Sequence, residues 1–214
     1  MVGLSVLLAV AVNEGGSSLQ SSVVESIPTV HVLELVSQEL ALVLMAFFGV
    51  GYLIQRDFRG SMERLGIKSL QLRQVWIAIS LVLALFAVSA VGSELTRVLQ
   101  PGLYQQINEN LGTMEEHVSS VGGALLLGIS VGLGEEILFR GAIQPRYGIV
   151  FTSIVFASLH VQYGLSFTIV GIFLLSIILG LIRKRISTSA SIITHAVFDT
   201  LAVLFSLAGG GGGS

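Results

Sequence analysis

Long apolar runs alternate with short polar connections along this chain. Five runs are long enough to cross or deeply enter a bilayer, because a spanning helix needs about 20 mostly apolar residues. They cover residues 35–54, 75–92, 119–142, 164–182 and 188–207, and a shorter sixth run covers 148–160. Residues 2–12 are also apolar and predict a signal peptide, a short first membrane helix or a truncated one. The pattern predicts an all-α, polytopic transmembrane helix bundle of about six or seven membrane helices, one of them short or broken.

The composition agrees with a membrane protein. Apolar residues make up 53% of the chain and charged residues 11%, against roughly 25% charged residues in soluble domains; the mean hydropathy is +0.88. The net charge of −2 gives no bias toward nucleic acid, and the absence of cysteine excludes disulfides and thiolate chemistry. No linker divides the interior, so we expect one transmembrane domain over 1–208, with 209–214 (GGGGGS) as a flexible linker.

The basic residues predict the orientation. If the six runs alternate in direction, every Lys and Arg except Arg97 falls on one side of the membrane. Basic loops face the cytoplasm, so the loops at 55–74 and 183–187 are expected there. The protein is then an integral membrane protein, which we place in the plasma membrane of a prokaryote. Glu39 is expected at the opposite, outer edge.

The apolar runs also contain ionisable residues, which are expensive in a bilayer and are usually functional there. These residues are Glu135, Glu136, Arg140, His160, His195 and Asp199. A purely structural role, as polar contacts between helices, is the alternative for each of them. At ~1.5 Å rise per residue from the cytoplasmic edge, Glu135 lies ~16 Å deep, His160 ~21 Å and His195 ~15 Å. Three separate helices are therefore expected to bring ionisable groups to nearly one level.

The spacing of these residues separates their roles. Glu136 and Arg140 stand at i,i+4 with the acid first, which favours an ion pair, while Glu135 is rotated by ~100°. Glu135 is then left facing the interior as a desolvated carboxylate, suited to act as a general base. His195 and Asp199 also stand at i,i+4 and address one side of the bundle.

Three glycines, Gly128, Gly132 and Gly134, precede the glutamate pair. Their spacing predicts a seam of small residues that lets another helix approach closely.

Three motifs resemble those of the CAAX protease and bacteriocin-processing (CPBP, or Abi) family of intramembrane proteases. EEILFR at 135–140 matches EExxxR, FASLH at 156–160 matches FxxxH, and HAVFD at 195–199 matches HxxxN or HxxxD. The segment ERLGI at 63–67 also looks like a recurrent feature of the cytoplasmic loop of such proteins. The resemblance covers a motif-bearing core at 119–207. This core is similar to the type II CAAX prenyl endopeptidases.

The resemblance implies hydrolysis of a peptide bond in a membrane-associated protein or peptide. Carried over by motif, Glu135 activates water, Glu136 and Arg140 support the site or help to bind substrate, and the two histidines and Asp199 complete it. Imidazoles are suited to stabilising the developing oxyanion. Eukaryotic members trim three residues from prenylated CAAX proteins, but prokaryotic members act on diverse substrates, so prenyl specificity is not implied.

The residue Asp199 departs from the asparagine found in eukaryotic CAAX endopeptidases. An ionised carboxylate cannot donate to an oxyanion, so Asp199 is protonated, or it orients His195 or a metal. Zinc is an alternative, because Glu135, His160 and His195 together match the two-imidazole, one-carboxylate pattern of catalytic zinc. A metalloprotease and a metal-free glutamate protease therefore both stay open.

Two other classes of protein use similar residues. A transporter or proton relay also carries intramembrane Glu and His, although no second copy of EExxxR suggests repeated halves. A non-catalytic immunity or scaffold protein of the same fold is the other alternative. The presence of all motif residues favours an enzyme whose partners are the lipid bilayer and a membrane-associated substrate.

Overall fold

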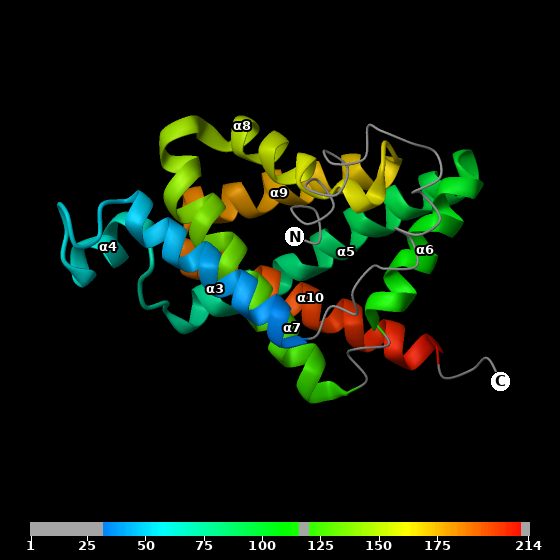
Figure 1. The fold of residues 1–214 in the computed structure, drawn as a ribbon, viewed down its shortest axis with the longest axis horizontal. Helices are drawn as coiled ribbons and strands as arrows, with labels where there is room; N and C mark the ends of the chain where they lie inside the picture. The colour runs from blue at the N-terminus through cyan, green and yellow to red at the C-terminus, as the bar shows by residue number, and fades with distance from the viewer. Residues whose placement is uncertain (1–31, 116–119, 211–214) are drawn as a thin grey trace, which may run out of the picture.

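The computed structural model describes residues 32–115 and 120–210, and within these ranges the chain forms helices and no β-strand (Figure 1). In chain order these are α3 (Val32–Gly49), α4 (Phe58–Leu65), α5 (Leu72–Leu99), α6 (Pro101–Glu115), α7 (Val121–Glu135), the π-helix η1 (Glu136–Ile143), α8 (Gln144–Ser158), the 3-10 helix η2 (Val161–Tyr163), α9 (Phe167–Arg185) and α10 (Thr188–Gly210). The predicted all-α class is confirmed. The apolar segment 2–12 lies outside the described residues, and α10 includes the first two residues of the predicted linker.

Four helices of the described chain are long and apolar enough to cross a membrane: α5, the continuous segment Val121–Ser158, α9 and α10 as far as Ala208. The helix α3 contributes a shorter apolar stretch, Leu35–Gly49. The run predicted at 35–54 is thus shorter in the structure. Its helix ends at Gly49, and the chain then turns through Gly51 (φ 91°) and Leu53 (φ 65°).

The segment Val121–Ser158 bends back on itself at Gly148. This residue has φ 83° and ψ 171°, a conformation that favours glycine over residues with a side chain. The returning α8 lies beside η1, where the rings of Phe139 and Phe156 meet edge to face at 5.1 Å between centroids. The short sixth run of the sequence is therefore the returning arm of a hairpin that turns at Gly148.

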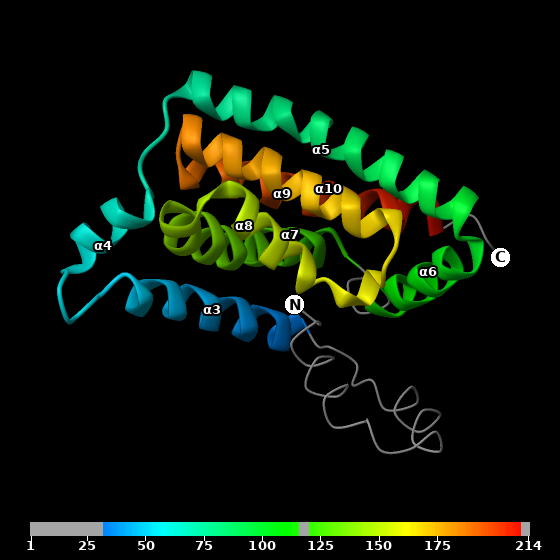
Figure 2. The same ribbon diagram turned by 90° about the horizontal axis from the view of Figure 1, so that it is seen from above.

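The helices are arranged in layers, which Figure 2 shows from above. The helix α5 packs on α9 and α10; α10 packs on α7, and α9 on α8; α3 covers the other side of α7. The glycine seam predicted on α7 is confirmed. A Cβ atom added at Gly128 would lie 2.2 Å from Thr200 Oγ1, and one at Gly132 would lie 2.8 Å from the Ala196 nitrogen. The missing side chains therefore let α10 approach the backbone of α7.

Apolar side chains cover much of the outside of the bundle, and polar side chains are buried inside it. Leu83 on α5 is 75% exposed and Trp76 is 61% exposed, whereas Glu136 and Arg140 are fully buried. In water this distribution would be unfavourable, but lipid surrounds exposed apolar groups without cost. The arrangement agrees with a protein whose outer surface lies in a membrane.

The loop after α4 fixes the start of α10. Gly66 (φ 73°) ends α4, its carbonyl accepts a hydrogen bond from the Thr188 nitrogen at 3.1 Å, and Thr188 Oγ1 donates to the Leu65 carbonyl at 2.6 Å. The segment ERLGI at 63–67 therefore has a structural role, because two of its carbonyl groups bind the first residue of α10. These contacts also place the two basic loops, at 55–74 and 183–187, at the same end of the bundle.

Candidate active site

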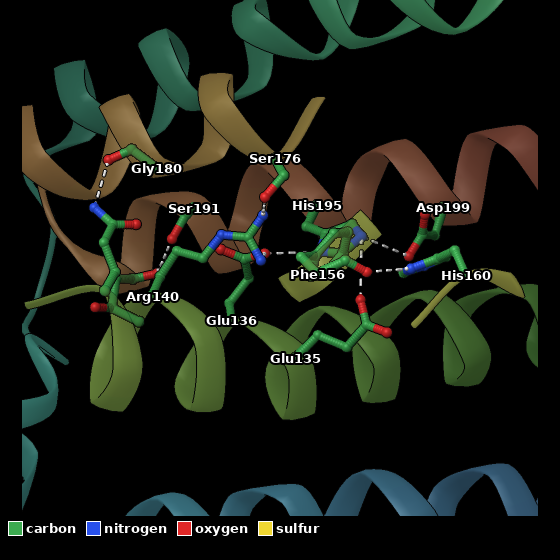
Figure 3. Close-up of polar contacts among 12 residues, drawn as sticks. Glu135, Glu136, Arg140, Phe156, His160, Ser176, Gly180, Ser191, His195 and Asp199 are labelled. Carbon is green, nitrogen blue, oxygen red and sulfur yellow. Dashed lines mark hydrogen bonds and ion pairs between the residues drawn. The ribbon is translucent and has the colours of Figure 1, made fainter. Parts of the chain in front are cut away.

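The predicted ion pair between Glu136 and Arg140 lies at the core of the bundle. Arg140 Nη1 is 3.2 Å from Glu136 Oε1, an ion pair by distance although not in hydrogen-bond geometry, and both side chains are fully buried. Arg140 Nη2 donates to Ser176 Oγ of α9 at 3.1 Å, and the guanidinium carbon lies 4.4 Å from the ring centroid of Phe156. The arginine is thus held by an acid, a hydroxyl and an aromatic face from three different helices (Figure 3).

Both residues of the pair lie in the π-helix η1, which the sequence did not predict. The π-helix follows directly on Glu135, the last residue of α7. Such wider turns occur frequently at functional sites. The backbone stays in the α-helical region at this junction (Glu135 φ −67°, ψ −44°; Glu136 φ −69°, ψ −36°), so the two glutamates keep the rotation of ~100° that their spacing predicts.

The imidazole of His195 on α10 joins the two glutamates. Its Nδ1 atom is 2.9 Å from Glu136 Oε1, and since an ionised carboxylate only accepts, Nδ1 donates this hydrogen bond. Its Nε2 atom lies 3.9 Å from Glu135 Oε2 and 3.4 Å from Asp199 Oδ2. His195 and Asp199 thus lie on the same side of α10, as their i,i+4 spacing predicted, whereas the bond to Glu136 was not foreseen.

The carboxylate of Glu135 is buried without a matching cation. The residue is 2% exposed, and its Oε2 atom has no hydrogen-bond partner among the described residues. Among the described residues, the only group within ion-pair distance of the Glu135 carboxylate is His195 Nε2. Glu135 and Glu136 therefore differ in the way that their spacing predicted: Glu136 is paired with Arg140, and Glu135 has no arginine partner among the described residues.

The second histidine, His160, lies just beyond the end of α8 rather than on a helix, which corrects its predicted placement. Its Nδ1 atom is 2.8 Å from the Phe156 carbonyl. A carbonyl only accepts, so Nδ1 carries the proton and Nε2 is the atom free to act. His160 lies close enough to Glu135 and His195 to interact with both electrostatically.

A further acid, Glu39 on α3, also reaches this region, and its predicted place at the outer edge is wrong. The residue is 3% exposed, and a Cβ atom added at Gly134 would lie 2.1 Å from its Oε2 atom. Glu39 therefore lies against the turn of α7 that leads into Glu135. A charged residue inside the apolar run 35–54 was the available signal. The sequence could not show that α3 turns this residue toward α7.

The zinc alternative requires two imidazoles and a carboxylate around one point. Within the described ranges, no group of three or more His, Asp or Glu side chains is placed to hold a metal ion. In this arrangement Glu135, His160 and His195 do not form the required ligand set. The Nδ1 atom of each histidine nevertheless bonds an acceptor, an arrangement that is also seen in metal-binding histidines.

Together these elements define a class of protein, a membrane helix bundle with acids and imidazoles gathered in its interior. The family comparison is more specific: residues 117–201 match the family model described as type II CAAX prenyl endopeptidase Rce1-like. The match spans less than half of the chain, is consistent with a CPBP family protein and confirms the resemblance that the three motifs carry. All six predicted site residues lie inside the matched segment, and Glu39 lies outside it. No curated protein and no solved structure matches the chain.

Proposed function

We propose that this protein is an intramembrane endopeptidase that hydrolyses a peptide bond of a membrane-associated protein or peptide. One observation carries the proposal. Glu135, the first residue of the EExxxR motif, has a buried carboxylate oxygen with no hydrogen-bond partner in the described chain, 3.9 Å from the His195 imidazole. A carboxylate desolvated in this way is suited to take a proton from water.

In the proposed reaction Glu135 is the general base. It accepts a proton from a water molecule, and the water oxygen forms the new bond to the peptide carbonyl carbon. The protonated Glu135 then donates this proton to the leaving amine as the carbon–nitrogen bond breaks. Glu135 thus returns to its initial state, and the hydrolysis is balanced without any other reactant.

The oxyanion that develops on the carbonyl oxygen needs a donor, and a neutral His160 with its proton on Nδ1 has none at Nε2, so we assign this role to His195. The His195 Nδ1 atom already donates to Glu136, so its Nε2 atom, which also faces Asp199 Oδ2 at 3.4 Å, is the one that meets the substrate. As an imidazolium, His195 donates from Nε2 while Glu136 holds Nδ1. Donors fixed in advance in this way stabilise the transition state more than the ground state.

The remaining residues position these groups. The Arg140 side chain neutralises Glu136, which in turn orients His195, and Asp199 contacts the same imidazole at Nε2. A buried pair of this kind fixes geometry more than it adds stability. The proposed mechanism routes no step through a metal.

The substrate class follows from the same family description. The matched family is described as prenyl endopeptidases, so a peptide with a prenylated C-terminal CAAX sequence is the most specific candidate. We propose the wider class, membrane-associated peptides, because the site residues are buried among helices that are long and apolar enough to cross a membrane.

A panel of quenched peptides tests this function. Purified protein in lipid nanodiscs is incubated with a farnesylated CAAX peptide, the same peptide without farnesyl, and a transmembrane peptide, and the products are identified by mass spectrometry. We expect cleavage at one peptide bond of a membrane-anchored substrate. Proton or solute transport by protein that cleaves none of the three would overturn the proposal in favour of a transporter.

A further inference from the structure

The helix α3 brings a carboxylate, Glu39, into the interior of the bundle without a visible counter-charge. The residue is 3% exposed, and its Oε2 atom has no hydrogen-bond partner among the described residues. None of the ion pairs among the described residues includes Glu39. A buried carboxylate without a partner destabilises the folded protein, and such groups cluster at functional sites.

The approach of Glu39 to α7 depends on a single glycine. A Cβ atom at Gly134 would lie 2.1 Å from Glu39 Oε2 and 2.9 Å from the Glu39 carbonyl oxygen, so any side chain there would displace the acid. Gly134 is the residue before Glu135. The close packing of α3 on α7 therefore sets the Glu39 carboxylate beside the backbone that carries the proposed base.

The unpartnered oxygens of Glu39 and Glu135 lie on facing helices. The Glu39 side chain packs on Gly134 of α7, and Glu135 is the next residue of that helix. Glu39 and Glu135 each have an Oε2 atom that is buried without a partner in the described chain. Two acceptors on neighbouring helices, one packed on Gly134 and the other on Glu135, suit a molecule with two donor hydrogens, and water is the smallest such molecule.

We infer that Glu39 positions the water molecule that Glu135 activates, an inference that rests on the proposed function. One hydrogen of the water bonds Glu135 and is the proton that transfers. The other hydrogen bonds Glu39 and stays on the oxygen, so Glu39 neither gains nor loses a proton. Holding both hydrogens fixes the direction of the oxygen lone pair that attacks the carbonyl carbon.

This role predicts opposite effects on stability and turnover. Replacing Glu39 by leucine removes an unpartnered buried carboxylate, so the protein should become more stable. The same change removes one of two contacts that orient the water, so kcat should fall. A residue with a purely structural role would lose stability and activity together, and a residue of no importance would change neither.

The experiment compares Glu39→Leu, Glu39→Gln and the exposed control Glu63→Gln with wild type and Glu135→Gln in nanodiscs, measuring kcat, KM and Tm on the cleaved peptide. For Glu39→Leu we expect kcat to fall by on the order of 10- to 100-fold with KM unchanged, and Tm to rise by roughly 2–4 °C. Glu39→Gln keeps an acceptor oxygen in nearly the same shape, so its kcat should lie between wild type and Glu39→Leu. Glu63→Gln should match wild type.

Each other outcome overturns the inference. Wild-type kcat in Glu39→Leu, while Glu135→Gln is inactive, removes Glu39 from the mechanism and leaves the proposed function intact. A joint loss of Tm and kcat assigns Glu39 a structural role. Absence of cleavage by wild type, or full activity of Glu135→Gln, rejects the mechanism as a whole and this inference with it.

Discussion

At one end of the buried polar site, the Arg140 guanidinium contacts Glu136 at 3.2 Å, Ser176 at 3.1 Å and the ring of Phe156. At the other end, the Oε2 atoms of Glu39 and Glu135 have no hydrogen-bond partner among the described residues. We call these the paired end (Glu136, Arg140, Ser176) and the open end (Glu39, Glu135). The imidazole of His195 bridges them, with Nδ1 on Glu136 and Nε2 toward Glu135.

The difference between the two ends separates support from chemistry. At the paired end, opposite charges compensate each other, so the groups are fixed and have little capacity to exchange protons. At the open end, no guanidinium is paired with the carboxylates, so a carboxylate there is available to accept a proton, which a base requires. Substitutions at the open end should therefore affect turnover, whereas substitutions at the paired end should affect folding.

The largest effect on activity is expected for Glu135→Gln. The substitution is nearly isosteric and removes the proton acceptor, so cleavage should fall by on the order of 10²- to 10⁴-fold. Because it also removes a buried charge without a cation, the thermal stability should be retained. Peptide cleavage and Tm in detergent are measured together; wild-type turnover in this variant would exclude Glu135 as the base.

The largest effect on stability is expected for Arg140→Gln at the paired end. Loss of the guanidinium leaves Glu136 buried without its cation, which should lower the free energy of unfolding by about 3–5 kcal/mol. The matched control is Arg59→Gln, which breaks an exposed pair with Glu63 and should cost at most about 1 kcal/mol. Equal stability of the two variants in thermal unfolding would refute the distinction between the two ends.

An intermediate effect is expected for Asp199→Asn. Asp199 contacts His195 Nε2, the atom that faces Glu135 of the open end, and its substitution distinguishes the metal-free mechanism from the zinc alternative. In a metal-free site an amide donates as a protonated carboxyl does, so the variant should keep substantial activity and extend it to higher pH. In a zinc site, loss of a carboxylate that orients His195 should cost roughly 10- to 100-fold in metal affinity or activity. We expect the first outcome.

The measurement for Asp199→Asn is cleavage against pH for the variant and wild type, each with and without a chelator, with bound metal quantified by elemental analysis. Stoichiometric zinc in wild type that is lost together with activity on chelation would refute the metal-free mechanism. Full activity of metal-free protein would refute the zinc alternative.

The smallest effect is expected for cysteines that test orientation, since they should leave activity unchanged. The chain has no native cysteine, and Ser69 and Gln106 are exposed on opposite sides in the predicted topology. An impermeant thiol reagent should label Gln106→Cys in intact cells and label Ser69→Cys only after lysis. Ser187 is unsuitable because it is buried. Labelling at position 69 from outside would invert the predicted orientation.

The sequence was sufficient for features that depend on local spacing. The i,i+4 relation of Glu136 and Arg140 and the rotation of Glu135 away from them both follow from helix geometry. The close packing at Gly128 and Gly132 follows from the size of glycine. Each of these needs only the neighbours of a residue along one helix.

Features that depend on two helices at once could not be predicted. The bond from His195 to Glu136 requires the relative rotation of α10 and η1, and the burial of Glu39 requires the rotation of α3 on α7. Apolar runs that lie in a membrane are hydrophobic on most sides, so their periodicity does not show which face turns inward. The π-helix depends on contacts of η1 with its neighbours and left no recognisable pattern in the sequence.

The central claim is that Glu135 activates a water molecule that attacks the peptide carbonyl directly. A single turnover of wild-type protein in water enriched in heavy oxygen tests it most directly, with mass spectrometry of both the cleaved peptide and the Glu135-containing fragment of the protein. The account predicts one heavy oxygen in the new carboxylate of the peptide and none in Glu135. Heavy oxygen in the Glu135 carboxyl group would show that Glu135 attacks the carbonyl itself, and would contradict the account.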